Sequence, residues 1–289
     1  MLDRTTTSCL ITSFFNVYFE VCGLCKDLDY LRIRLDMFEK LTLKSVLNQR
    51  YKNFEYIVFF CEDVFESKDI ERIKNISGIT PIFLSAQAYD AQRDFVPVIN
   101  SKLRDSSHVV ITKLDCDDMI HADYLSTIFD TFDPKKLDMF CFRIGYYYCQ
   151  GSNYIFSKKA GNSSPIFTLI EKCNSNINAR NDVFSYDHNE LFKKYSKYSR
   201  KLSSPTNLWL KYQHAYTIGR VSDQIKWNYD YKKLGEYMLN VVKKKRMKDN
   251  PKTILSSGES NYCCDMFGIS CDDLMKSEWN TGEENDKCS

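Results

Sequence analysis

The sequence has no marked excess of charge of either sign. Its 289 residues include 40 lysines and arginines and 38 aspartates and glutamates. A general nucleic-acid binder would show a strong basic excess, so we expect no nucleic-acid partner. No internal repeat is visible, and no apolar run approaches the roughly 20 residues that a membrane-spanning helix needs. Repeat proteins and helical membrane proteins are therefore not expected.

The first residues also lack the basic segment and following apolar stretch of a secretory signal peptide. The 12 cysteines do not indicate a disulfide framework in a chain of this length. Several of them lie inside apparent strands, where they act as small buried hydrophobic side chains: Cys9, Cys61, Cys141 and Cys149. We therefore expect a cytoplasmic protein in a reducing compartment.

Only one Cys-x-x-Cys pair is present, formed by Cys22 and Cys25. A structural zinc site would need a second pair of ligands, and Cys263, Cys264 and Cys271 lack the required spacing. A redox pair would sit at a helix start after a strand, whereas this pair lies in a loop-like segment. Plain thiols are the favoured interpretation.

What is present is an alternation of apolar strands and amphipathic helices. Apolar content is 43% and aromatic content 14%, enough for one large globular domain, alone or with an appendage. The alternation predicts an α/β fold with a mostly parallel sheet and helices on both faces. Strands are predicted at 9–14, 56–60, 80–85 and 108–114, and helices at 31–49, 67–76, 94–103 and 122–132.

The second half of the chain is less regular. One strand is predicted at 139–148, a hairpin partner at 154–156 and a further strand at 165–171. The polar stretch 172–200 indicates loops, and 229–248 indicates a helix with a basic end. Residues from about 250 onward are rich in Ser, Asp and Glu, which predicts a poorly ordered tail or a short capping element.

The most informative feature is the acidic cluster Asp115, Asp117 and Asp118, which follows the predicted strand 108–114. The carboxyl edge of such a sheet is where open α/β folds bind ligands. Three carboxylates this close repel one another unless a cation or a donor network offsets them. A hard divalent ion that also binds water and a diphosphate would do so. The cluster therefore favours an enzyme acting on a nucleotide-linked substrate.

An acidic cluster of this kind also occurs in three different structural settings. An EF-hand counted from Asp115 would need Gly and Glu where Ile120 and Ser126 stand, which excludes it. A haloacid-dehalogenase-type phosphatase carries its nucleophile on the first strand, usually before Asp-Gly-Thr, whereas Met119 follows this cluster on the fourth strand. The third setting, a solvated acidic turn that caps the next helix, stays open.

Four segments, taken together, form a specific pattern. They are Thr12-Ser13-Phe14-Phe15-Asn16; Arg34 to Gln49 followed by Asn53-Phe54-Glu55-Tyr56; Thr112-Lys113-Leu114-Asp115-Cys116-Asp117-Asp118; and Trp209-Leu210-Lys211-Tyr212-Gln213-His214. In this pattern the chain resembles the rhamnosyltransferase family of bacterial and phage proteins, which are nucleotide-sugar glycosyltransferases of the GT-A fold. It departs from the family at Ser13 and Lys113, where arginines are expected, and at Thr217, where an asparagine is expected.

The resemblance implies one GT-A domain over residues 1–249. Its donor half would cover about 8–120, its acceptor half about 121–228 and its last helix about 229–248. Residues 250–289 form the tail.

The resemblance also implies a Mn²⁺ or Mg²⁺ site. Asp117 would be the metal carboxylate, Asp115 would hold the ribose or a metal-bound water, and Asp118 would complete the shell or cap the next helix. His214 would be a further metal or phosphate ligand, with a packed histidine as the alternative. Lys113 would place a point charge on the diphosphate.

The donor site implied by the resemblance also includes Thr12, Phe14 and Arg34, although an exposed helix-start arginine would look the same in sequence. Asp63, at the end of the second strand, would accept the N–H of a uracil or thymine ring. Its alternative is a solvated strand-end carboxylate.

An inverting transferase needs a base for the acceptor hydroxyl. Asp187 is the first candidate in the acceptor half, and Asp182 and Glu171 are its rivals; the alternative is that none of them is catalytic. The basic cluster at 243–248 would attract anionic lipids, which suits a lipid-linked acceptor at the inner face of the membrane. More commonly, such a cluster is a solvated helix face.

Three functions follow as hypotheses. The first is metal-dependent transfer of a sugar, rhamnose by analogy, from a nucleoside diphosphate sugar to a glycan or lipid-linked acceptor. The second is a nucleotidyltransferase, which would normally carry a Gly-rich basic loop after the first strand, where only Gly23 and Lys26 occur. The third is a catalytically inactive carbohydrate-binding or scaffold protein on the same fold.

Overall fold

A computed structural model gives the architecture of the chain. Four features of interest lie outside the residues it describes: Cys22 with Cys25, Asp187, His214 and the predicted helix 229–248. Within the described part of the chain, no helix has the length and apolar character that a bilayer span requires. The structure describes residues 2–15, 28–85, 95–103, 106–133, 137–150, 155–159, 166–174, 179–183, 188–213 and 255–275.

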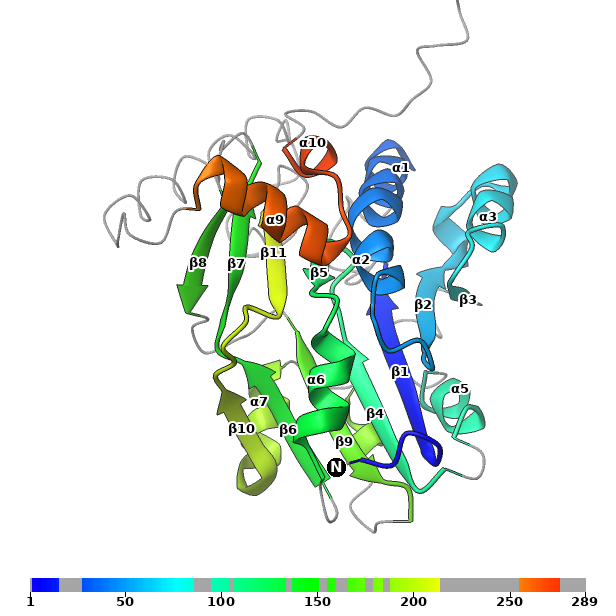
Figure 1. Ribbon diagram of the computed structural model, residues 1–289. Coiled ribbons are helices and arrows are strands. Elements are labelled where there is room, and N and C mark those ends of the chain that lie inside the picture. Colours follow the sequence, from blue (N-terminus) through cyan, green and yellow to red (C-terminus); the bar gives the residue numbers. More distant parts are fainter. Residues whose placement is uncertain are drawn as a thin grey trace, which may run out of the picture.

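The larger of two sheets has seven strands in the order β10-β6-β9-β4-β1-β2-β3. Strand β9 is antiparallel to both of its neighbours, β4 and β6, and the other pairs are parallel, which confirms the mostly parallel α/β sheet. Figure 1 shows β1 and β4 side by side at its centre. The strands are β1 (Thr7–Phe14), β2 (Glu55–Cys61), β3 (Thr80–Leu84), β4 (His108–Lys113), β6 (Leu137–Phe142), β9 (Phe167–Lys172) and β10 (Ser199–Leu202).

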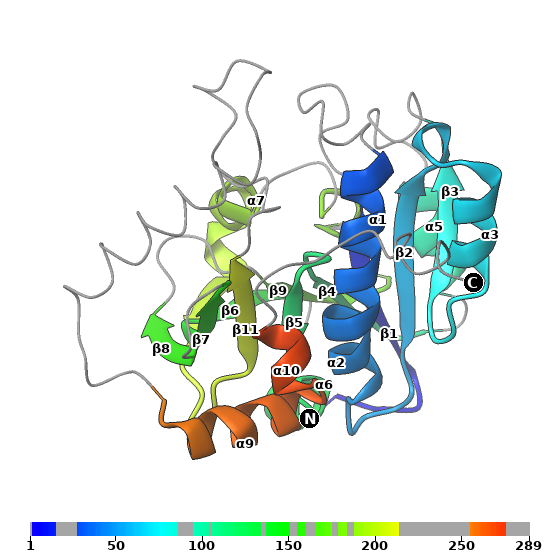
Figure 2. The same cartoon turned by 90° about the horizontal axis from the view of Figure 1, so that it is seen from above.

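Helices cover both faces of this sheet because its strands are apolar on both sides. In β2, Tyr56, Val58 and Phe60 belong to the core beneath α1, α2 and α6. The alternate residues of β2 face a second core with α5 and α7. Figures 1 and 2 show α6 and α7 on opposite sides of the sheet. The α-helices of this part are α1 (Leu28–Met37), α2 (Lys44–Leu47), α3 (Ser67–Lys74), α5 (Phe95–Ser101), α6 (Tyr124–Thr131) and α7 (His188–Lys194).

The predicted helix 31–49 is continuous but not uniform, because a π-helical segment, η2 (Phe38–Leu43), joins α1 to α2. The remaining short turns are 3₁₀-helical, and they include the end of β2, where Asp63 lies. They are η3 (Glu62–Val64), η4 (Ala179–Asn181) and η5 (Ser196–Tyr198).

The smaller sheet has four strands in the order β5-β11-β7-β8. It corrects the prediction of one strand over 139–148, because the chain leaves the large sheet after Phe142 and enters the small one at Ile144. The predicted hairpin partner is confirmed as β8, antiparallel to β7. The strands are β5 (Asp118–Ile120), β7 (Ile144–Cys149), β8 (Ile155–Lys159) and β11 (Trp209–Gln213).

The junction between the sheets is fixed by Trp209. Its indole N–H donates to the Phe142 carbonyl at 2.8 Å, and its ring lies against Gly145. A Cβ atom at Gly145 would lie 2.1 Å from the indole ring, so only glycine allows this approach. The sequence pattern did not reveal this break, because apolar and aromatic residues continue on both sides of Arg143.

The prediction of a poorly ordered tail is wrong for residues 255–275, where the alternative of a short capping element holds. Helix α9 (Ser257–Phe267) begins with a capping box between Ser256 and Glu259. It ends at Gly268, whose φ of 67° suits a left-handed cap. Helix α10 (Cys271–Leu274) follows directly.

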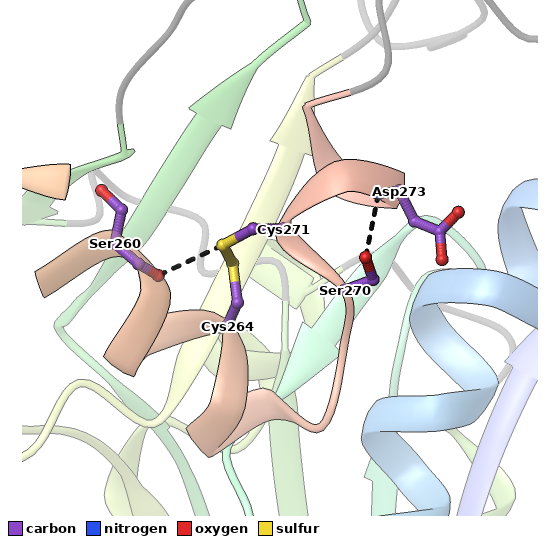
Figure 3. The surroundings of a disulfide bond; sticks show 5 residues. All are labelled: Ser260, Cys264, Ser270, Cys271 and Asp273. Atoms are coloured by element: carbon purple, nitrogen blue, oxygen red, sulfur yellow. Dashed lines mark hydrogen bonds between the residues drawn. A yellow bond between two sulfur atoms is a disulfide. The ribbon is translucent and has the colours of Figure 1, made fainter. Parts of the chain in front are cut away.

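This element is held to the core by burial and by backbone hydrogen bonds. Phe267 is fully buried, and its ring meets His121 edge to face at 5.6 Å. The Ala122 N–H donates to the Met266 carbonyl at 2.9 Å. Figure 3 shows a disulfide between Cys264 and Cys271, a pairing that the sequence did not indicate.

Candidate functional site

The acidic cluster lies where the chain passes from the large sheet to the small one. Strand β4 ends at Lys113, and β5 begins at Asp118. One carboxylate oxygen from each of Asp115, Asp117 and Asp118 lies within 4.8 Å of the others. Asp115 is exposed, Asp117 is partly buried and Asp118 is fully buried. The three carboxylates therefore converge on one point that solvent reaches from the side of Asp115.

Hydroxyl groups from neighbouring elements fix the backbone of this loop. Ser13 Oγ donates to the Leu114 carbonyl at 2.7 Å, and Thr42 Oγ1 donates to the Cys116 carbonyl at 3.0 Å. The Asp118 N–H donates to the Asp115 carbonyl at 3.1 Å and closes a turn. Because these contacts come from β1 and η2, the spacing of the carboxylates depends on the packed core and not on the loop alone.

Arg34 reaches the cluster from α1. Its Nη1 donates to Asp117 Oδ2 at 2.8 Å, and the side chains are only 9% and 12% exposed. Burial is the largest single effect and lowers the pKa of Arg34, but the charge and hydrogen bond of Asp117, together with Tyr30 and Cys116, outweigh it, so the pKa lies above its usual range. Arg34 is therefore a permanent cation beside Asp117.

Lys211 is a second cation at the cluster, and sequence analysis gave it no role. Strand β11 pairs with β5 so that Lys211 stands opposite Asp118, and Lys211 Nζ lies 3.5 Å from Asp118 Oδ2. The Tyr212 N–H donates to the other oxygen of Asp118 at 3.2 Å. Lys211 is a polar residue between the buried Leu210 and Tyr212, and this alternation could have indicated that its side chain lies on the other face of the strand. The pairing of β5 with β11, however, was not predicted.

The closeness of these charged groups shifts the pKa values of Asp118 and Lys211. Burial raises the pKa of Asp118 well above its usual range; the nearby charges of Asp117 and Asp115 raise it further, and Lys211 opposes them. Burial lowers the pKa of Lys211, but the three carboxylates outweigh it and raise the pKa overall. The cluster favours additional positive charge.

The predicted donor residues on β1 and β4 lie nearby, in contacts of their own. Thr12 is fully buried, and its Oγ1 donates to the Thr112 carbonyl at 3.4 Å. Phe14 stacks on Phe59 with ring centroids 5.1 Å apart. Lys113 Nζ lies 5.5 Å from the centre of the Phe14 ring. Asp63 is exposed in η3 at the end of β2.

The two rivals for the catalytic base are both engaged with neighbours. Asp182 accepts hydrogen bonds from the Tyr195 hydroxyl and from Lys194 at 2.7 Å. Glu171 is fully buried, accepts the backbone N–H groups of Ala179 and Arg180 and pairs with the Arg180 side chain. It pairs in register with Val109, near the start of β4 and about 13 Å along the strand from Lys113, after which the acidic cluster follows.

The chemistry of the cluster fits a hard divalent cation. All its donors are carboxylate oxygens, which Mg²⁺ and Mn²⁺ prefer, and their separation permits shared coordination. Among the described residues, no other group of three His, Cys, Asp or Glu side chains meets the same geometry. A metal at this point would be held by Asp115 and Asp117, with Asp118 anchored behind them.

Several solved structures are similar to the chain at low sequence identity. A putative nucleotide-diphospho-sugar transferase from Desulfovibrio desulfuricans G20 is 12% identical, with 81% of this chain and 97% of that chain covered and a TM-score of 0.38. The inositol-1-phosphate CTP transferase from T. maritima is 11% identical, with 71% and 89% covered and a TM-score of 0.34. At these TM-scores the likeness carries no argument about substrate.

Comparisons at the sequence level give a clearer answer. No curated protein matches the chain. The model of the family described as "Putative rhamnosyl transferase" matches residues 24–216, which is more than half of the 289 residues. This match confirms the family indicated by the four sequence motifs. The chain therefore belongs to the "Putative rhamnosyl transferase" family of glycosyltransferases.

Proposed function

We propose that the protein transfers a sugar, rhamnose by the family's description, from a nucleoside diphosphate donor to a glycan or lipid-linked acceptor. The transfer would invert the anomeric centre and depend on Mn²⁺ or Mg²⁺. The observation that carries the proposal is the convergence of three carboxylates within 4.8 Å at the carboxyl end of β4. This is the edge at which α/β sheets bind nucleotides.

The proposed roles follow from burial and charge. Asp117 and Asp115 would hold the cation, and His214 would be a further ligand by the family pattern. The bound cation would act as a Lewis acid on the departing diphosphate. Asp118, buried and bonded to Tyr212 N–H, would set the position of the other two carboxylates. Lys113 would add positive charge for the diphosphate.

The remaining donor contacts are proposed from the resemblance. Thr12 and Phe14 lie near the end of β1, where the donor would bind. Arg34 would act through its hydrogen bond to Asp117, and Asp63 would accept an N–H of the nucleotide base. The fixed pairing of Arg34 with Asp117 supports a role beside the metal for this arginine.

For the acceptor, Asp187 would take the hydroxyl proton as the new glycosidic bond forms. Asp182 and Glu171 are already bonded to their neighbours, which disfavours both of them as the base. The basic cluster at 243–248 would hold the enzyme at an anionic inner membrane face, near a lipid-linked acceptor.

The test is a thermal-shift panel with UDP, dTDP and GDP, each with Mn²⁺ and with EDTA. A ligand that binds the native state increases the free energy of unfolding by mass action, by about 2.7 kcal/mol at a hundred times its Kd. The melting temperature rises accordingly. We expect a shift with one nucleotide that requires metal and is lost in Asp117→Ala. Asp123→Ala, which removes a carboxylate outside the cluster and paired with Arg50, should keep the shift. No metal-dependent shift with any nucleotide would contradict the proposal and favour the scaffold hypothesis.

A further inference from the structure

The acidic cluster already contains its own counter-ions. Arg34 Nη1 lies 2.8 Å from Asp117, and Lys211 Nζ lies 3.5 Å from Asp118. The three carboxylates, when ionised, carry three negative charges, and the two side-chain cations reduce the sum to one. Such a site attracts a dication far less than three unopposed carboxylates would.

Burial strengthens this effect. In the Arg34 pair the side chains are 9% and 12% exposed, and in the Lys211 pair the carboxylate is fully buried. Ion pairs shielded from water interact more strongly than surface pairs, so a dication does not displace them easily. A free cation arriving from solvent meets one exposed carboxylate, Asp115, and two that are already paired.

We propose that Arg34 and Lys211 are positioning residues that keep the affinity for a free dication low, so that the cation binds together with the donor diphosphate. Arg34 and Lys211 neutralise two of the three carboxylate charges. The diphosphate supplies oxygen ligands and new negative charge, so the cation binds well once the diphosphate is present. This inference rests on the proposed function. It predicts that nucleotide and metal bind with strong mutual dependence.

The chain offers a matched control on the same helix. Arg32 lies two residues before Arg34 on α1 but faces α3, where it pairs with Asp69 at 2.9 Å and Glu66 at 2.8 Å. Its side chain is 14% exposed. Arg32→Met therefore removes one positive charge from a comparable ion pair whose partners, Asp69 and Glu66, lie outside the cluster.

The experiment measures Mn²⁺ affinity from the electron paramagnetic resonance signal of free Mn²⁺, alone and with UDP, dTDP or GDP. Wild type should bind Mn²⁺ alone weakly, and at least about tenfold more tightly with one nucleotide. Arg34→Met should bind Mn²⁺ alone on the order of tenfold more tightly than wild type, because one charge near the cation is gone. Arg32→Met should behave like wild type.

Conservative variants keep the test independent of folding. Arg34→Lys retains the charge and should retain the low affinity for Mn²⁺ alone. If Arg34→Met does not fold, Arg34→Gln removes the charge but still offers an amide N–H to Asp117. Circular dichroism of each variant checks its fold before Mn²⁺ is added.

Two failures are distinguishable. Wild type that binds Mn²⁺ alone as tightly as with nucleotide, or a charge-removing variant at Arg34 that binds no more tightly, overturns the inference and leaves the donor site standing. Wild type that binds none of the nucleotides, with or without Mn²⁺, overturns the proposed function and this inference with it.

Discussion

Two fully buried carboxylates lie near opposite ends of β4 and are stabilised in different ways. Near its start, Glu171 receives two backbone N–H groups and the Arg180 guanidinium. Beyond its carboxyl end, Asp118 receives one backbone N–H and Lys211, and it shares its surroundings with two further carboxylates.

This difference separates a structural carboxylate from one in the proposed binding site. The donors around Glu171 satisfy a single negative charge, so nothing more is needed there. In the acidic cluster two side-chain cations face three carboxylates, so a bound cation could interact with the remaining carboxylate oxygens. Burial alone therefore does not identify the site; the balance of charges and donors does.

The largest effect is expected from removing the structural carboxylate, Glu171. Glu171→Ala leaves two buried N–H groups and Arg180 without their acceptor, and we expect a loss of about 3–5 kcal/mol in the free energy of unfolding. Urea denaturation measures it. Asp130→Ala, which removes an exposed ion pair with Arg4, should cost well under about 1 kcal/mol. A Glu171 variant of normal stability would contradict the structural role.

The second prediction concerns Asp115, the exposed carboxylate of the acidic cluster. Asp115→Asn should leave stability nearly unchanged, because the side chain is exposed, but weaken Mn²⁺-dependent nucleotide binding by about 10- to 100-fold. Isothermal titration with nucleotide and Mn²⁺ measures the loss. Unaltered binding would remove Asp115 from the site.

A smaller effect is expected from removing a contact that positions the acidic loop, residues 114–117. Ser13→Ala removes the donor to the Leu114 carbonyl and leaves the Tyr56 hydroxyl without its partner at 2.9 Å. We expect a loss of about 1–3 kcal/mol in unfolding free energy. In a double-mutant cycle with Tyr56→Phe the two losses should not be additive, and additivity would mean that the hydroxyl pair contributes little.

The smallest effect is a pH dependence at His121. Burial lowers its pKa from 6.5; Asp123 opposes this and Arg50 adds to it. The unfolded chain therefore takes up the proton at higher pH than the folded one, so stability is unaffected well above 6.5 and falls as the pH drops below it. His121→Asn, which can still accept the Asp123 N–H, should show a flatter decline in urea midpoints between pH 7 and 5. Equal slopes would contradict this assignment.

Much of the large sheet and the acidic cluster could be predicted because their signals are local. The run from Val109 to Asp118 is apolar and β-branched up to the point where β4 ends, so strand and cluster are visible together. Lys211 could not be found in this way. Its role depends on the pairing of β11 with β5, which brings it opposite a residue 93 positions earlier in the chain.

The two corrected predictions have the same cause. The break after Phe142 depends on Trp209 packing against Gly145, a contact between distant segments. The C-terminal helices looked too polar to be ordered, yet few apolar residues suffice when Phe267 and Leu274 are both fully buried. Local composition underestimates a segment whose stability comes from the surface on which it packs.

The acidic loop, residues 114–117, is one of the covalent links between the two sheets, as is Arg143 between β6 and β7. Ser13 ties its first part to β1 in the large sheet, while Tyr212 and Lys211 tie Asp118 to β11 in the small one. A ligand that bridges the carboxylates would therefore link the two sheets non-covalently and restrict their relative motion. Amide hydrogen exchange should then slow in β1 and β11 alike on binding, although neither strand supplies the three carboxylates.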